Sequence, residues 1–276
     1  MKRWISAAFA IGSFFGTLGV SAFAFFQLRT VTSSAAATPV NQSSNQQVVT
    51  AASPAGSFVD AQAFFTDRKL TLSLTPSKSI TGVTYSLYTD TTDKNVTQAA
   101  DELQSEWKKY SQNTLNKSGL RTIYLVRNLR IDGQARSAYP EPVFEDALYF
   151  DIGDVYLQSE NTQYMRRTFH HEYNHLLVFN LFGAYEPADA AWLRCNAADF
   201  SYGTGGPSMY DDVNFAHKEH PTYGFVDGYA TSGVAEDKAE VFARFMTDPA
   251  GLQKLADKDA GISCKLSQTV TLLQNL

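Results

Sequence analysis

The chain of 276 residues contains 44% hydrophobic and 18% charged residues, a composition typical of a globular protein with room for one well-buried domain. Its formal net charge at pH 7 is -5, with 28 acidic residues against 23 Lys and Arg. Nucleic acids and anionic membrane surfaces are recognised by clustered Lys and Arg, so we expect no nucleic-acid partner and no anionic-membrane partner.

The first 28 residues have the outline of an export signal. Lys2 and Arg3 precede a run from Trp4 to Leu28 that carries no charge and is rich in Ala, Phe, Gly and Val. We therefore expect an extracytoplasmic protein. The motif AFA at residues 22–24 fits a signal-peptide cleavage site, whereas an apolar run of about 25 residues is also long enough to span a bilayer. Secretion after cleavage and retention by an N-terminal membrane anchor both stay open.

Residues 29–57 form a predicted tether. No charged residue occurs between Thr30 and Val59, where Ser, Thr, Ala, Gln and Asn dominate. Such a segment buries too little apolar surface to offset the entropy of ordering it, so we expect a flexible linker. A single folded domain then spans residues 58–276.

Strand-like and helix-like periodicities alternate in the first half of this domain. Residues 81–89 and 121–128 are β-branched and aromatic runs of strand length, and residues 96–110 between them repeat apolar side chains at helical spacing. A further strand-like run, residues 147–152, precedes a helix that we expect from about Glu160 to Phe182. The predicted class is α+β, with a mixed sheet, a long helix after the sheet and a C-terminal helical part.

Three of the five histidines lie within this long helix, in the stretch HHEYNH at residues 170–175. His171 and His175 are four residues apart, so on a helix their imidazoles project from one face and can converge on a cation. Imidazole nitrogen suits Zn²⁺, and a catalytic zinc keeps three protein ligands and one water. Glu172 lies about 100° around the helix from His171, so it can approach that water as a base without binding the metal. The HExxH pattern therefore predicts a zinc site, with a polar surface pair on an ordinary helix as the alternative.

Residues 229–246 show a second helical periodicity and are the expected source of a third ligand. Apolar residues recur there every three or four positions, while Glu236 and Glu240 stand four residues apart on the adjoining strip. One carboxylate can bind zinc, and the other can hold a ligating imidazole through its second ring nitrogen. A solvated charged face is the alternative.

The two stretches resemble the gluzincin family of zinc metallopeptidases, in particular the secreted bacterial group related to the catalytic domain of anthrax lethal factor and to the Pro-Pro endopeptidases. The resemblance rests on HHEYNH and on GYATSGVAEDKAEVFARF at residues 228–245, and it covers about residues 145–250. The family pattern is HExxH, then a Tyr seven residues before the first Glu of an ExxAE-type helix. It implies a zincin-like metalloprotease fold in which Tyr229 points its hydroxyl at the scissile carbonyl oxygen. It also implies an edge strand that holds substrate by strand addition, for which residues 147–152 are the candidate.

Position by position, the resemblance implies that His171, His175 and Glu236 bind one catalytic Zn²⁺ ion. It implies that Glu172 is the general base and that Glu240 supports a ligating histidine. The implied function is an exported zinc metalloendopeptidase that acts on protein or peptide substrates, hydrolysing peptide bonds with zinc-activated water. We also expect the protein to be a monomer.

One departure from the family leaves the third ligand open. His175 and Glu236 are 61 positions apart, which is longer than in compact gluzincins, so we expect residues 183–228 to form an insertion over or beside the cleft. Glu240 and Asp237 are the next candidates for the third ligand.

The remaining histidines and a glycine-rich segment have weaker assignments. His217 or His220 replaces the carboxylate ligand if the site has three histidines, although a pair of loop histidines is the plainer interpretation. His170 points about 100° away from His171 and is expected to be a packing or substrate-side neighbour. The segment YGTGGPS at residues 202–208 lacks the GK[ST] of a phosphate loop, so a mobile flap near the site is expected instead.

Cys195 and Cys264 are the only cysteines. An exported chain with an even number of cysteines permits one disulfide, and two buried free thiols are the alternative. Neither cysteine has the spacing of a metal site.

Two functions of other classes also fit the motif. The domain can be a zinc-binding extracytoplasmic module that only binds, or a hydrolase of a non-peptide amide. Glu172 argues against the first, since a module that only binds needs no base beside its metal. HExxH alone does not exclude the second, and the sequence does not decide the substrate, the cleavage preference or any activation step.

Overall fold

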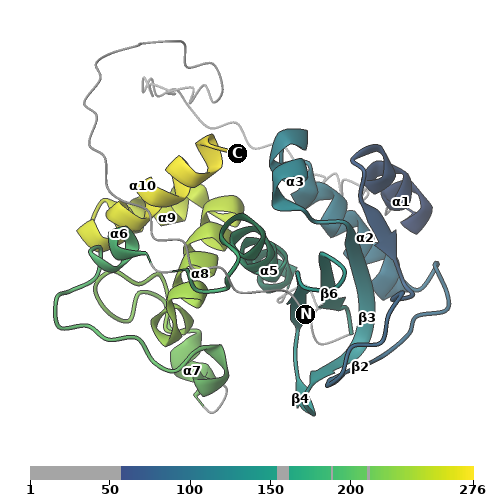
Figure 1. Ribbon diagram of the computed structural model, residues 1–276, viewed down its shortest axis with the longest axis horizontal. Coiled ribbons are helices and arrows are strands. Elements are labelled where there is room, and N and C mark those ends of the chain that lie inside the picture. Colours follow the sequence, from purple (N-terminus) through teal and green to yellow (C-terminus); the bar gives the residue numbers. More distant parts are fainter. Residues whose placement is uncertain (1–56, 154–161, 188, 210–211) are drawn as a thin grey trace, which may run out of the picture. The chain divides into compact units, whose positions relative to one another are not determined.

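The computed structural model describes residues 57–153, 162–187, 189–209 and 212–276. The predicted export segment, and the predicted linker up to residue 56, lie outside the described residues. The predicted α+β class with a mixed sheet is confirmed (Figure 1). Among the described residues, no helix combines the length and the apolar character needed to cross a membrane.

The sheet and three helices come first in the chain. In order, the elements are α1 (Phe58–Asp67), β1 (Thr71–Ser73), β2 (Val83–Ser86), α2 (Lys94–Trp107), α3 (Gln112–Ser118), β3 (Thr122–Ile131), β4 (Gln134–Ala135), β5 (Ala138–Glu141) and β6 (Ala147–Asp151). Helix α1 begins with a capping box, because the Asp60 N–H donates to the Ser57 hydroxyl while the Ser57 N–H donates to the Asp60 carboxylate.

The rest of the chain is helical. Its elements are α5 (Thr162–Phe182), α6 (Ala190–Leu193), the 3-10 turn η1 (Gly206–Met209), α7 (Val213–Ala216), the 3-10 turn η2 (Tyr229–Ser232), α8 (Val234–Thr247), α9 (Pro249–Ala256) and α10 (Ala260–Gln274). α5 has the expected extent over its described residues. The second predicted helix starts later than its periodicity suggested, because residues 229–232 form the separate turn η2 and Gly233 is extended before α8 begins.

The sheet is built around β3. This strand pairs in parallel with β1 and β6 and, toward its end, antiparallel with β2 and β4, while β5 pairs antiparallel with β6. The order β1-β3-β6-β5 places β6 inside the sheet, so the prediction that residues 147–152 form the edge strand was wrong. All five residues of β6 are buried, and a continuous apolar run is what a strand with neighbours on both sides requires. The edge strand next to α5 is β5.

A core of aromatic side chains holds α5 against the sheet. Trp107 of α2 is fully buried at its centre, with ring centroids 6.1 Å from Phe65 and Phe169 and 6.4 Å from Phe150. Phe169 belongs to α5 and Phe150 to β6, so one indole links two helices and a strand. α5 is thereby fixed on its sheet side, while α8 packs along it from the other side (Figure 1).

A disulfide and a buried ion pair hold the C-terminal helices together. Cys195, just after α6, is bonded to Cys264 of α10, which decides between the two alternatives for these cysteines. Lys265 is fully buried and lies 2.7 Å from Asp237 of α8, and its ammonium also donates to the Gly224 carbonyl at 2.6 Å. These contacts tie the predicted insertion to the helix that carries the candidate third ligand.

Candidate metal centre

α5 carries the two histidines of the HExxH motif on one face, as their four-residue spacing requires. His171 and His175 are buried, with 7% and 8% of their surface exposed. Their Nε2 atoms are 2.9 Å apart and their rings meet edge to face, with centroids separated by 4.6 Å. Both imidazoles therefore present a nitrogen to the same point beside the helix.

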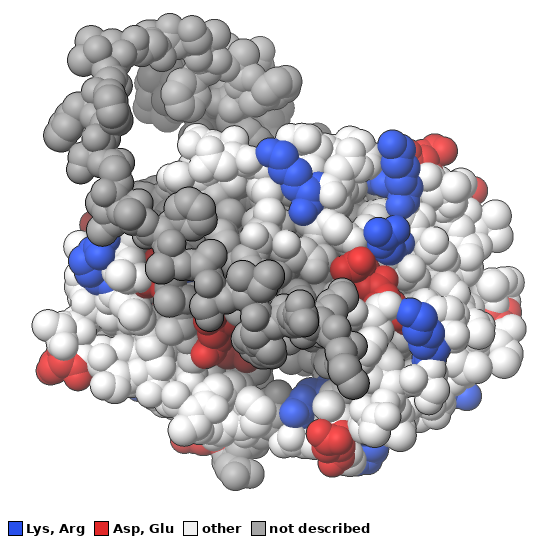
Figure 2. All heavy atoms as spheres, in the orientation of Figure 1, with Lys and Arg blue, Asp and Glu red and all other residues white. Residues whose placement is uncertain are grey.

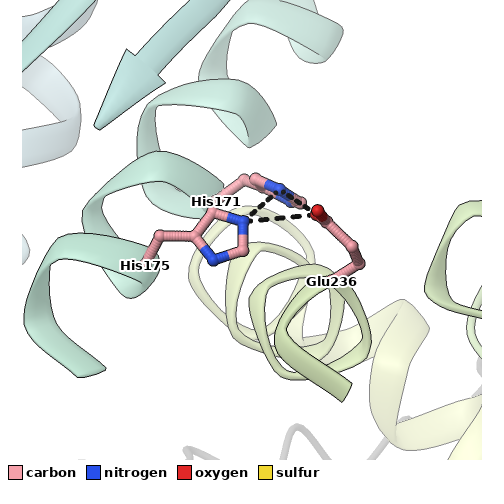
Figure 3. Close-up of side chains that lie close together, drawn as sticks. All are labelled: His171, His175 and Glu236. Atoms are coloured by element: carbon pink, nitrogen blue, oxygen red, sulfur yellow. Dashed lines mark hydrogen bonds and ion pairs between the residues drawn. The ribbon is translucent and has the colours of Figure 1, made fainter. Parts of the chain in front are cut away.

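Glu236 reaches this point from the first turn of α8 (Figure 3). Its Oε2 atom lies 3.0 Å from Nε2 of His171 and 3.2 Å from Nε2 of His175. Within the described residues, these three side chains form the group whose ligand atoms all lie within 4.8 Å of one another. The pairing of α5 with α8 creates the contact, since the residues are far apart in the chain.

The group has the spacing and charge of a zinc site. Tetrahedral zinc with bonds of about 2.0 to 2.1 Å sets its ligand atoms about 3.3 Å apart, close to the separations of 2.9, 3.0 and 3.2 Å here. Burial raises the pKa of Glu236, but His175 and His171 hold it well below its usual value. Burial lowers the pKa of His171, but Glu236 and Glu240 raise it well above its usual value. An ionised carboxylate at the point where the two imidazole nitrogens meet favours a cation there.

Glu240 lies one turn after Glu236 and stands behind His171. Its Oε1 atom is 3.0 Å from Nδ1 of His171, although the contact lacks the alignment of a standard hydrogen bond, and its Oε2 atom pairs with Arg167. A carboxylate at this nitrogen favours the tautomer with the proton on Nδ1, which leaves Nε2 available as a ligand. The structure thus places Glu236, and not Glu240, beside the two Nε2 atoms.

Glu172 and His171 both line a cavity of about 290 Å³. The cavity lies among α5, the segment before β5, α7 and η2, and part of its lining comes from the insertion, as expected. Burial raises the pKa of Glu172, although His171 and His175 lower it. A raised pKa makes a carboxylate a better proton acceptor, which is the property that a general base requires.

Tyr229 begins η2 and lines the same cavity. Its ring centroid is 5.8 Å from that of His171. Gly206 lies directly against its hydroxyl, because a methyl group added at Gly206 would sit 2.2 Å from the Tyr229 oxygen and 2.8 Å from Oε1 of Glu236. The tyrosine hydroxyl is therefore close to the ligand group.

The glycine-rich segment 202–208 lies next to Tyr229 and Glu236, in agreement with its predicted location near the site. Its backbone is bonded to η2: the Gly203 N–H donates to the Thr231 carbonyl at 3.1 Å, and the Gly205 N–H donates to the Ser232 carbonyl at 2.8 Å. The segment therefore supports the turn that carries Tyr229.

Asp237, the other carboxylate considered as a ligand, points away from the histidines. It is fully buried, pairs with Lys265, and accepts hydrogen bonds from Trp192 Nε1 at 2.8 Å and the Tyr202 hydroxyl at 2.6 Å. The sequence alternative that Asp237 is the third ligand is wrong in this structure, because adjacent residues on a helix face directions about 100° apart.

The loop histidines lie outside the ligand group. His217 lines the cavity, with its ring centroid 5.8 Å from that of Tyr164. His220 instead lies 3.0 Å from Oδ2 of Asp259, which caps α10. Neither histidine belongs to the group formed by the ligand atoms.

His170 faces the core on the side of α5 that packs against α2. It is fully buried, its Nδ1 lies 2.5 Å from the Tyr110 hydroxyl and its Nε2 lies 2.6 Å from Oε2 of Glu106. Of its two expected roles, the structure shows the packing neighbour.

Among the described residues, β6 is the strand that pairs with β5, and part of β5 borders the cavity. The Asp151 N–H donates to the Ser137 carbonyl at 2.9 Å, so in the alternating antiparallel ladder Ala138 and Pro140 direct their backbone groups away from β6. The Pro140 carbonyl accepts a hydrogen bond from the Tyr185 hydroxyl at 3.2 Å. Ala138 lines the cavity, so its N–H and carbonyl are placed for a strand that adds to this edge.

Sequence reasoning missed some residues of the site. Arg167 and Asp227 both line the cavity, and so do residues 135–138. Arg167 precedes His171 by four residues and so shares its helix face, which was a usable signal. No local pattern pointed to Asp227 or to the segment before β5.

Basic side chains do not form a continuous patch on the face shown in Figure 2, where the visible Lys and Arg are interspersed with Asp and Glu.

Comparison of the chain with protein-family models, with curated proteins and with solved structures found no match.

Proposed function

We propose that this chain is an exported zinc metalloendopeptidase with a zincin-like fold, of the gluzincin type. The observation that carries the proposal is the convergence of His171, His175 and Glu236 on one point, with Glu172 beside them in a cavity. A polar surface pair does not account for this arrangement, because the two histidines are buried and need partners for their ring nitrogens.

Each residue has one role in the proposed reaction. His171, His175 and Glu236 hold the zinc ion, which when bound supplies a Lewis acid that polarises a carbonyl and lowers the pKa of water. Glu172 accepts a proton from the attacking water and delivers it to the leaving amine. Tyr229 donates a hydrogen bond to the carbonyl oxygen as negative charge develops on it.

The substrate in this proposal is an extended peptide that adds to β5 as an antiparallel strand. It exchanges two hydrogen bonds with the N–H and carbonyl of Ala138, and one of its side chains enters the cavity. Since Tyr185 already occupies the Pro140 carbonyl and proline has no N–H, we expect the strand contact to end there.

The proposal places the enzyme outside the cytoplasm, either secreted or held by its N-terminal segment. The Cys195–Cys264 disulfide supports this location, because disulfides form and persist in oxidising compartments.

The test is cleavage of a degenerate peptide library by the zinc-loaded full chain, measured beside Glu172→Gln. We expect the wild type to cleave peptides and the variant to lose turnover while its zinc content, measured by elemental analysis, stays at one ion per chain. Loss of zinc in His171→Ala and His175→Ala completes the contrast. If wild type with stoichiometric zinc cleaves no peptide, the peptidase proposal fails, and a non-peptide amide hydrolase or a binding module takes its place.

A further inference from the structure

Arg167 connects the candidate metal centre to the turn that follows the insertion. It lies on α5 one turn before His171, and its Nη2 atom contacts two carboxylates: Oδ2 of Asp227 at 2.6 Å and Oε2 of Glu240. Glu240 in turn lies behind His171, with 3.0 Å between Oε1 and Nδ1. A chain of contacts therefore runs from Asp227 through Arg167 and Glu240 to a proposed zinc ligand.

Asp227 has a second contact that connects this series of contacts to Tyr229. Its Oδ1 atom accepts the Ala230 N–H at 3.0 Å, inside the turn η2 that Tyr229 begins. Asp227 is 4% exposed, so neither carboxylate oxygen is placed on the surface. The same carboxylate thus anchors Arg167 on one side and the tyrosine turn on the other.

The burial of these groups makes the arginine necessary for their arrangement. The side chains of Asp227 and Glu240 are 5% and 12% exposed, and that of Arg167 is 26% exposed. Two buried carboxylates close to each other repel, and each needs a partner to offset the loss of hydration. Without the guanidinium, Glu240 loses the cation that pairs with its Oε2 atom, so its carboxylate is held less firmly against His171.

We propose that Arg167 and Asp227 are positioning residues, with Arg167 holding Glu240 against Nδ1 of His171 and Asp227 holding Arg167. The inference rests on the proposed function, since it requires that His171 bind zinc through Nε2. Carboxylates behind ligating histidines strengthen the ligand and fix its orientation, and their loss costs about 10- to 100-fold in metal affinity. Arg167 acts on the metal through Glu240 and does not touch it.

The neighbouring residue Arg166 supplies a matched control. It also lies on α5 and also forms an ion pair with carboxylates, at 2.5 Å from Oε2 of Glu102 and 3.8 Å from Oε1 of Glu106, but on the side of α2. Arg166→Gln removes the same charge from the same helix without touching the candidate metal centre.

The experiment measures the zinc affinity of the full chain by competition with a chromophoric chelator, without any substrate. We expect Arg167→Gln to bind zinc about 10- to 100-fold more weakly than wild type, and Arg166→Gln to bind it with unchanged affinity. Arg167→Lys, which keeps the charge without the planar fork, is expected to lie in between. Asp227→Asn should weaken binding in the same direction. The absorption spectrum of the Co²⁺-substituted protein should shift in Arg167→Gln and not in Arg166→Gln.

A double-mutant cycle tests whether Arg167 acts through Glu240. Glu240→Gln should weaken zinc binding by itself, and adding Arg167→Gln in that background should change the affinity little further. Additive losses would overturn the proposed route. Thermal unfolding of each zinc-free variant shows which variants fold. If Arg167→Gln does not fold, the zinc affinity of Arg167→Lys provides the test.

The outcomes separate the two proposals. If wild type binds zinc tightly and Arg167→Gln binds it equally well, the positioning role is refuted and the metallopeptidase proposal stands. If wild type binds no zinc, both are refuted.

Discussion

A single methyl group at Gly206 tests how closely the reaction depends on the position of Tyr229. In Gly206→Ala the new carbon would lie 2.2 Å from the Tyr229 oxygen, whereas an ordinary contact begins at 3.4 Å. The hydroxyl must therefore move by about 1.2 Å. The backbone at Gly206 is not left-handed, so the substitution acts through this contact and not through backbone strain. A misplacement of about 1 Å in a positioned catalytic group costs about 100-fold in rate.

The assay is steady-state cleavage of a peptide selected from the library. We expect kcat of Gly206→Ala to fall about 100-fold, with a smaller effect on zinc affinity, since the methyl group meets Oε1 of Glu236 and the histidines contact Oε2. Gly203→Ala is the control, because its added carbon meets the Ser232 carbonyl at 3.3 Å and requires a shift of only about 0.1 Å. Its kcat should stay within about threefold of wild type.

A second background isolates the hydroxyl. In Tyr229→Phe the group that makes the shortest contact is absent, so adding Gly206→Ala should lower kcat much less than it does in wild type. If Gly206→Ala folds, binds zinc and cleaves at the wild-type rate, the hydroxyl has no role in the reaction, and the assignment of Tyr229 is refuted.

Three further predictions concern stability. Lys265→Met leaves Asp237 as an uncompensated buried charge, so the free energy of unfolding in urea should fall by about 3 to 5 kcal/mol. Adding Asp237→Asn should recover part of that loss. A loss below about 1 kcal/mol in Lys265→Met would contradict this prediction. The Cys195–Cys264 bond closes a sequence separation of 69 residues, so replacing both cysteines with Ser should cost about 4 kcal/mol, and a reductant should lower the melting temperature of wild type only. Burial raises the pKa of Asp259, but hydrogen bonds from backbone N–H groups and a histidine lower it overall. The pKa of Asp259 in the folded state thus lies below the unfolded value of about 3.9. Its contribution to the free energy of unfolding is therefore present above pH ~4 and is lost as the pH falls through the lower folded value. Asp259→Asn should therefore flatten the fall in melting temperature between about pH 5 and pH 2, and an unchanged slope would refute this.

The placement of the two histidines could be predicted because it depends on local geometry. His171 and His175 are one helical turn apart, and a helix brings such residues to one face whatever surrounds it. The same holds for Glu236 and Glu240, whose spacing indicated that both carboxylates would serve one site. Which of the two meets the Nε2 atoms depends on how α8 packs on α5, and that contact has no signal in either helix alone.

Local sequence patterns did not predict which strand lies at the edge of the sheet. Residues 147–152 were correctly predicted as a strand from their apolar run, but the same run made them unsuitable for an edge. The four residues of β5 include a proline and no long apolar run, so their pattern did not stand out. Its place beside the cavity follows from the antiparallel pairing with β6, which is a non-local contact.

The sequence by itself determined the α+β class, the helix that presents two imidazoles on one face, and the pair of carboxylates on a second helix. Each of these follows from interactions between residues a few positions apart. Tertiary structure decided that Glu236 is the carboxylate beside the histidines, that Asp237 pairs with Lys265, that β5 is the edge strand, and that Arg167 bridges Asp227 and Glu240. These contacts join residues that only the packing of α5, α8 and the insertion brings together, so no periodicity in the chain could have predicted them.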